Sequence, residues 1–228
     1  MRLVKFCLMT VVIATPAAAA PAELDQAFAA AFGHAAPYTM TASGGTLEKP
    51  TEFTYTPSGL EEVTPGIVAL ISEGKLTSFG CHACLGTLAI HYLKRDGENF
   101  ALLGAWPAIG GAAPYGAAAA WTVRKDLDDV PLLVTKEDDG GQGCYETWAD
   151  LIALTPAQPL LASRLPLATE YVPEPDQKKP GYKLSGRLIP IERGKRFAVQ
   201  YSGTRSLRVE YRHSGDVYVA RGKTAPVC

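Results

Sequence analysis

Four consecutive residues, Cys81-His82-Ala83-Cys84, place two thiols and an imidazole within a few bonds of one another. Two cysteines separated by two residues serve thiol–disulfide exchange, metal binding, haem attachment or simple cross-linking. Haem attachment requires a histidine directly after the second cysteine, and Leu85 occupies that position. Three kinds of chemistry therefore remain for this segment: redox exchange, coordination of a soft metal, and a structural disulfide.

The neighbouring residues favour the structural disulfide. Thioredoxin-type exchange places the first cysteine at a helix N-terminus, where the helix dipole stabilises the thiolate. Here a strand pattern follows Leu85-Gly86, so no such helix is predicted. Zinc or copper(I) needs about four ligands, and the available set is Cys81, His82, Cys84 and Cys144. Because adjacent ligands are poorly placed to meet at one ion, metal binding at Cys81, His82 and Cys84 stays an alternative, and no cofactor is expected.

The N-terminus has the order of a secretory signal peptide. Arg2 and Lys5 precede the apolar run 6–13, and small residues follow at 17–20. The run is too short to span a bilayer, and no other segment approaches about eighteen uninterrupted apolar residues. We therefore expect cleavage within a few residues of position 20 and an exported protein, periplasmic or secreted, with no transmembrane segment in the mature chain.

Four cysteines remain once Cys7 leaves with the signal peptide: Cys81, Cys84, Cys144 and Cys228. An even number of cysteines in an exported chain is typical of disulfides, and four cysteines allow three pairings. A bridge from Cys144 to Cys228 would close a long loop and anchor the last residue. Crossed pairings such as Cys84 to Cys144 are equally compatible with the sequence.

The charge balance bears on the kind of partner that the protein is expected to bind. The chain has 22 basic and 23 acidic residues, and loss of Arg2 and Lys5 leaves 20 and 23, a net charge of −3. That balance gives no reason to expect a nucleic acid, and no cluster of Lys and Arg along the sequence predicts a membrane-binding patch. A protein or glycan of the cell envelope is the expected kind of partner.

The hydrophobic pattern predicts one helix followed by many strands. Leu24, Phe28 and Phe32 recur every four residues before Gly33, which indicates an amphipathic helix over 22–32 whose apolar stripe docks on a sheet. Downstream, short alternating segments are bounded by Gly, Pro or acidic residues, without βαβ alternation. Strands are predicted at 51–55, 67–71, 87–93, 100–106, 120–124, 130–135, 145–154, 160–171, 186–191, 196–202, 207–212 and 216–221.

The predicted fold is therefore mainly β: an antiparallel sandwich- or barrel-like domain with an N-terminal helix and a small C-terminal β-meander. Its organisation is a signal peptide over 1–20, the helix and main β domain over 21–171, a Pro-rich linker over 172–183 and the meander over 184–228. About 45 residues is near the lower limit for independent folding, so we expect the meander to pack on the main domain.

Enzyme motifs are lacking. No Gly-x-Ser-x-Gly occurs, and the four histidines are spread along the chain. His91 lies on the strand face opposite Leu88, Ile90 and Tyr92, which predicts a solvent-facing side chain. The acidic clusters do not fit the EF-hand pattern and are interpreted as solvated turns. No catalytic residue is proposed from the sequence.

The segment 104–119, rich in Gly and Ala, is predicted to be a long irregular loop. Exposed aromatic rings around it would suit a sugar or a peptide, whereas buried ones would belong to the core. We expect a non-enzymatic binding or envelope-associated protein stabilised by disulfides; the alternative is a thiol-redox or soft-metal protein acting through Cys81, His82 and Cys84. The ligand-contact candidates are Trp106, Tyr115, Trp121, Tyr145 and Trp148.

Overall fold

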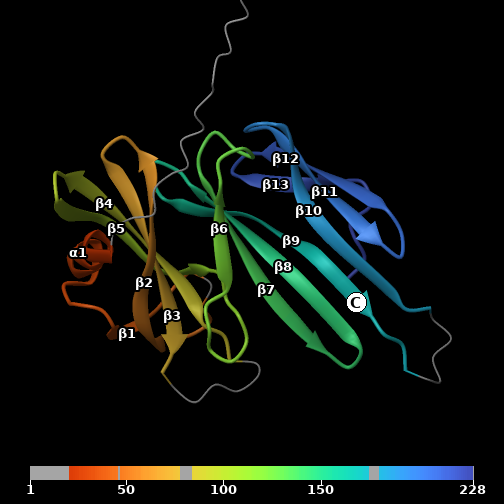
Figure 1. Ribbon diagram of the computed structural model, residues 1–228, viewed down its shortest axis with the longest axis horizontal. Helices are drawn as coiled ribbons and strands as arrows, with labels where there is room; N and C mark the ends of the chain where they lie inside the picture. The colour runs from red at the N-terminus through yellow and green to blue at the C-terminus, as the bar shows by residue number, and fades with distance from the viewer. Residues whose placement is uncertain (1–20, 46, 78–83, 175–179, 228) are drawn as a thin grey trace, which may run out of the picture.

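The computed structural model describes residues 21–45, 47–77, 84–174 and 180–227 (Figure 1). Within these ranges, one helix is followed by strands that form two antiparallel sheets, one of five strands and one of eight. The predicted class, mainly antiparallel β with an N-terminal helix, is confirmed. The elements are α1 (Pro21–Phe32), β1 (Tyr38–Ala42), β2 (Thr51–Thr64), β3 (Ile67–Leu76), β4 (Thr87–Asp96), β5 (Asn99–Gly110), β6 (Ala120–Arg124), β7 (Leu132–Gly141), β8 (Cys144–Leu154), β9 (Pro159–Tyr171), β10 (Tyr182–Glu192), β11 (Arg196–Gly203), β12 (Leu207–Ser214) and β13 (Val217–Arg221).

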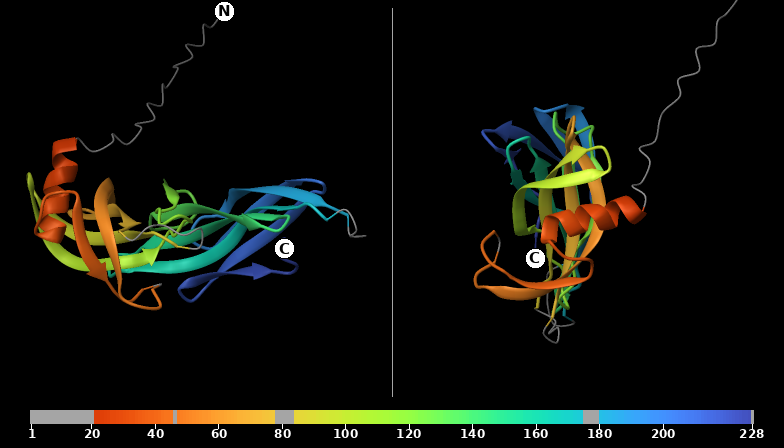
Figure 2. Two further views of the ribbon diagram at one scale, coloured as in Figure 1. Left: turned by 90° about the horizontal axis from the view of Figure 1, so that it is seen from below. Right: turned by 90° about the vertical axis from the view of Figure 1, so that its left-hand side faces the viewer.

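The first sheet, β1 to β5 in chain order, curves around α1 as a half-barrel (Figures 1 and 2). Phe28 is fully buried from α1, and Leu24 and Phe32 pack partly buried against the same cluster. The sheet contributes Phe53 and Leu93, among others, to that cluster. The predicted docking of the apolar helix stripe onto a sheet is therefore confirmed. No helix among the described residues is long and apolar enough to cross a membrane.

Strand β4 is buried on both faces. Leu93 faces the helix, whereas Leu88 and Ile90 pack against Leu133 and Ile152 of the second sheet. Because both faces of β4 are covered, every residue from Thr87 to Leu93 is buried. The strand joins the helix core to the core between the two sheets.

The second sheet runs without a break in pairing from β6 to β13. Strand β10 pairs with β9, with Leu184 opposite Thr169, and residues 175–179 of the predicted linker lie outside the described residues. The sheet closes over a core of its own, in which Tyr218 from β13 donates a hydrogen bond of 2.8 Å to Asp128. Ala225, close to the chain end, is only 3% exposed in this core.

Two predicted breaks turn out to be parts of strands. Strand β5 continues to Gly110, so the predicted loop 104–119 is wrong and only residues 111–119 separate β5 from β6. Residues Pro57-Ser58-Gly59, which lie between the predicted strands 51–55 and 67–71, form a bulge inside β2. Tertiary packing outweighs low intrinsic strand propensity in both places, and Pro107 is tolerated because β5 is an edge strand.

The predicted exposure of His91 is also wrong: this side chain is 3% exposed. The strand face opposite Leu88 and Ile90, which we expected to meet solvent, is covered by α1. Burial lowers the pKa of His91 from its ordinary value of 6.5 to about 4. His91 is therefore a neutral core residue near pH 7.

Candidate functional site: a groove over strands β7 to β10

The five candidate aromatic residues lie in different environments. Trp106 and Trp121 are partly buried in the cluster between the two sheets. The ring of Trp106 meets Tyr92 edge-on at 5.0 Å between ring centroids, and the Trp121 indole donates a hydrogen bond of 3.1 Å to the Ser58 hydroxyl. These two tryptophans hold the sheets together.

Trp148 belongs to a group of charged side chains on β7, β8 and β9. The guanidinium of Arg164 lies 5.4 Å from the centre of the Trp148 ring, and it donates to Glu137 at 2.7 Å and to Asp150 at 3.1 Å. Asp150 also accepts a hydrogen bond of 3.2 Å from the backbone of Gly111. The group therefore ties the end of β5 to the second sheet.

The side chains of Glu137 and Asp150 are 9% and 5% exposed, whereas the side chain of Arg164 is 43% exposed. Burial raises the pKa of Glu137, and the nearby Arg164 guanidinium opposes that rise. Because every carboxylate here has a charged partner, we interpret the group as structural.

Tyr145 and Tyr115 are the two exposed candidates, with 55% and 64% of their surfaces accessible. Tyr115 lies in the connection between β5 and β6, with a positive φ of 60°. Tyr145 lies in β8 and lines a groove of about 560 Å³ that crosses four neighbouring strands of the second sheet. We take this groove as the candidate site.

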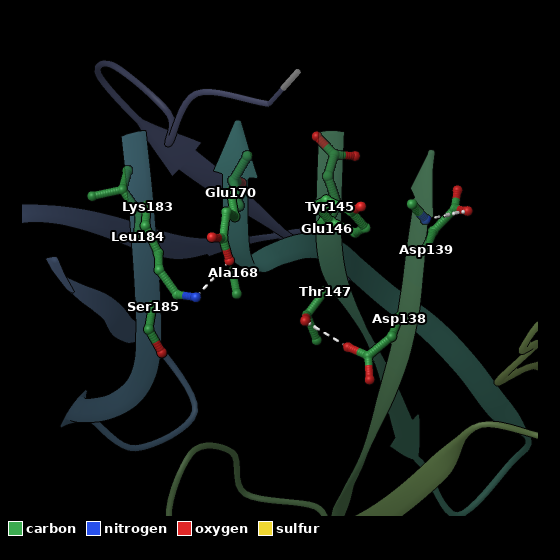
Figure 3. Close-up of a pocket in the computed structure, with 12 residues that line it drawn as sticks. Asp138, Asp139, Tyr145, Glu146, Thr147, Ala168, Glu170, Lys183, Leu184 and Ser185 are labelled. Atoms are coloured by element: carbon green, nitrogen blue, oxygen red, sulfur yellow. Dashed lines mark hydrogen bonds and ion pairs between the residues drawn. The ribbon is translucent and has the colours of Figure 1, made fainter. Parts of the chain in front are cut away.

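Strands β7, β8, β9 and β10 each supply polar side chains to the groove (Figure 3). Thr147 of β8 donates a hydrogen bond of 2.6 Å to Asp138 of the neighbouring β7. Lys183 of β10 forms an ion pair with Glu170 of β9 at 2.5 Å. Direct strand pairing explains both contacts, because Asp138 is opposite Thr147 and Lys183 is opposite Glu170.

The groove is acidic and carries one prominent aromatic ring. Its lining residues include four acidic ones, Asp138, Asp139, Glu146 and Glu170, and a single basic one, Lys183. The strand pairings place Asp138 and Glu170 on the same face of the sheet as Tyr145, and Asp139 and Glu146 on the other face. A phenol beside an excess of carboxylates provides attraction for positive charge, from both the carboxylates and the ring face. The arrangement suits a ligand that carries ammonium or guanidinium groups together with hydrogen-bond donors.

Of the cysteines, Cys84 and Cys144 lie within the described residues, whereas Cys81, His82 and Cys228 lie outside them. The Cys84 carbonyl accepts a hydrogen bond of 2.6 Å from Gly116, and Cys144 begins β8 beside the groove. Neither cysteine lacks an interaction partner. In the described part of the chain, no three His, Cys, Asp or Glu side chains are grouped to hold a metal. The soft-metal alternative therefore stays a prediction.

Sequence reasoning named Tyr145 but missed the polar residues around it. Asp138, Thr147, Glu170 and Lys183 lie on four different strands and meet through the registers of three strand pairs. The acidic run at 137–139 was the one available signal, and it was interpreted as a solvated turn. Comparison with protein-family models, curated proteins and solved structures finds no match.

Proposed function

We propose that this chain is an exported, non-enzymatic binding protein whose groove over β7 to β10 holds a basic peptide segment of an envelope protein. One observation carries the proposal: the groove of about 560 Å³ combines the exposed Tyr145 ring with an excess of carboxylates. An extended peptide crossing the groove would place cationic side chains against Asp138 and beside Tyr145. A protein partner is favoured over a glycan because the groove is charged.

The groove supports binding better than catalysis. Its lining contains Ser185 and Thr147 but no histidine, and Thr147 donates its proton to Asp138. An activated hydroxyl nucleophile needs an adjacent base that is itself oriented by a third group. The three described histidines do not contribute to the groove lining.

Export is supported by the signal-peptide pattern of residues 1–20, and it makes disulfides expected. The pairing Cys144–Cys228 has structural support from neighbouring described residues. Thr169, opposite Glu146 in β8, donates a hydrogen bond of 3.0 Å to the carbonyl of Pro226. Cys228 follows Pro226 by two positions in the sequence, and Cys144 precedes Glu146 by two. Cys81–Cys84 is then the second pair.

Titration calorimetry with tetralysine as the probe tests the groove directly. We expect tetralysine to bind and its affinity to fall at high salt. Tyr145→Ala and Asp138→Asn should each reduce the affinity by about five-fold, which corresponds to about 1 kcal/mol. Tyr115→Ala, which removes the other exposed tyrosine, is the control and should leave binding unchanged. Equal binding of tetraglutamate, or full binding by both groove variants, would contradict the proposal.

A further inference from the structure

The charges of the chain are divided unevenly. Residues 182–227 have ten basic and three acidic side chains, whereas residues 21–181 have ten basic and twenty acidic ones. The basic segment forms β10 to β13, at the end of the molecule opposite α1 (Figures 1 and 2). No basic run marks this segment in the sequence, because basic and apolar residues alternate along its strands. The fold converts that alternation into a charged surface.

Strand alternation directs the arginines away from the core. Phe197 and Val199 of β11, and Val209 and Tyr211 of β12, are buried inside the second sheet. Residues between such positions point to the opposite face. We name that face the arginine face, and its charged members are Arg187, Arg196, Arg208, Arg212, Arg221 and Glu210.

The registers of β10 to β13 bring like charges together on the arginine face. Arg196 lies directly opposite Arg212, an arrangement that is unfavourable without a compensating anion. Glu210 lies 2.8 Å from Arg212 and 3.8 Å from Arg196, and Glu192 lies closer to Arg196, at 3.3 Å, so these two carboxylates supply the compensation. In the described part of the chain, Arg187 and Arg208 form no ion pair, so their charge is left for an external anion.

Two shallow hollows border the arginine face. One, of about 480 Å³, is lined by Lys195, Arg196, Arg212 and His213 together with Glu192 and Gly194. The other, of about 330 Å³, joins Arg187 to the amide of Gln200 and several serine hydroxyls. Guanidinium groups and hydroxyls together are the donors that phosphate oxygens require.

Other features of this face favour a lipid surface among anionic partners. Val217 and Val219 point to the same side from the edge strand β13 and are 42% and 48% exposed. The described aromatic rings of β10 to β13 all pack on the core side, so none of them can stack on a nucleic-acid base. Exposed aliphatic residues beside arginines are typical of surfaces that rest on anionic membranes.

We infer that the arginine face docks on a membrane rich in anionic phospholipid. This inference rests on the proposed export and is independent of the groove. The acidic remainder of the molecule would be repelled by the same membrane, which fixes the orientation: β10 to β13 toward the lipid and α1 away from it. Docking is electrostatic, so salt weakens it.

Co-sedimentation of the mature chain with phosphatidylglycerol-containing phosphatidylcholine vesicles tests the inference. We expect binding at low salt, loss of binding at high salt, and no binding to phosphatidylcholine alone. Arg187→Gln with Arg208→Gln should weaken partitioning about thirty-fold, since each basic residue near an anionic surface contributes roughly a five-fold effect. The matched control is Lys49→Gln with Lys75→Gln, which removes one exposed charge from the connection between β1 and β2 and one from β3, and should leave binding unchanged.

Equal loss in both double variants would indicate a net-charge effect and overturn the assignment of this face. Binding to polyphosphate or DNA without binding to vesicles would overturn the lipid partner. Tyr145→Ala should bind vesicles as the unmodified chain does, whereas its binding of tetralysine should be about five-fold weaker. Failure of either proposal is thereby distinguished from failure of the other.

Discussion

The imidazole of His91 lies 4.4 Å from the ring of Phe32, measured between ring centroids, and α1 covers it from solvent. Its Nδ1 atom is buried and has no hydrogen-bond partner among the described residues. Tyr55 also packs near Phe32, at 5.4 Å between ring centroids, and burial raises the pKa of its phenol. Burial of the imidazole in these apolar surroundings therefore disfavours the imidazolium ion.

Stability is therefore expected to fall as the solution is acidified. The pKa of His91 is near 4 in the folded chain and near 6.5 in the unfolded chain, so the unfolded chain binds a proton first as the pH falls. The full stability is present above about pH 6.5 and is lost as the pH falls toward 4, by up to about 3 kcal/mol from this residue. Urea unfolding of the natural chain and of His91→Leu across this range checks the prediction: the variant should lose most of the slope.

Replacement of Arg164 should be strongly destabilising. Arg164→Met leaves Glu137 and Asp150 buried without their cationic partner, and breaking such a pair usually costs about 3–5 kcal/mol. Because Arg164 is 43% exposed, we expect a smaller loss, about 2 kcal/mol. The urea midpoint should fall with an unchanged slope. Arg205→Met, which removes an exposed arginine outside any ion pair of the described residues, should shift stability by no more than about 0.5 kcal/mol.

Disulfide mapping of protein purified from the exporting compartment without reductant should find four blocked cysteines, paired Cys81–Cys84 and Cys144–Cys228. Loss of the long-range bridge through Cys144→Ser with Cys228→Ser should lower stability by about 4–5 kcal/mol in the chain-entropy model. A readily reduced pair at Cys81 and Cys84 would instead support the thiol-redox alternative. Any crossed pairing would contradict the proposed position of the chain end.

The turn between β7 and β8 offers a stabilising substitution. Gln142 and Gly143 have positive φ values of 52° and 78°, as a type I′ turn requires. Asparagine adopts this conformation more readily than glutamine, so Gln142→Asn should stabilise by about 0.5 kcal/mol and raise Tm by about 1–2 °C. Gln158→Asn, at an exposed position without positive φ, should leave Tm unchanged.

Local patterning predicted most of the elements but not strand β1, and it did not predict the surroundings of the elements. The helix stripe at Leu24, Phe28 and Phe32 and most strand positions follow from periodicity, because each element buries at least one apolar face. His91 was misassigned because periodicity separates two faces without saying whether a second layer covers the outer one. The extension of β5 beyond the predicted strand 100–106, from Pro107 to Gly110, was missed because it depends on tertiary packing.

The groove and the arginine face depend on strand register, which the sequence specifies only indirectly. Tyr145 could be named as a candidate from its type alone. Its neighbour across the sheet, Glu170, is brought there by the pairing of β8 with β9. Likewise, Arg196 and Arg212 meet because β11 and β12 pair in one particular register. Surface chemistry built across strands is not visible along any one of them.

The position of α1 has a consequence for how the protein is made. Under the proposed export, the chain would cross the membrane N-terminus first, so the helix would be among the earliest parts of the mature protein to emerge. Phe28 packs in one cluster with Leu93 and Phe100, some seventy residues later in the chain. Until those residues arrive, the apolar side of the helix faces water, and a chaperone of the exporting compartment has its earliest target there.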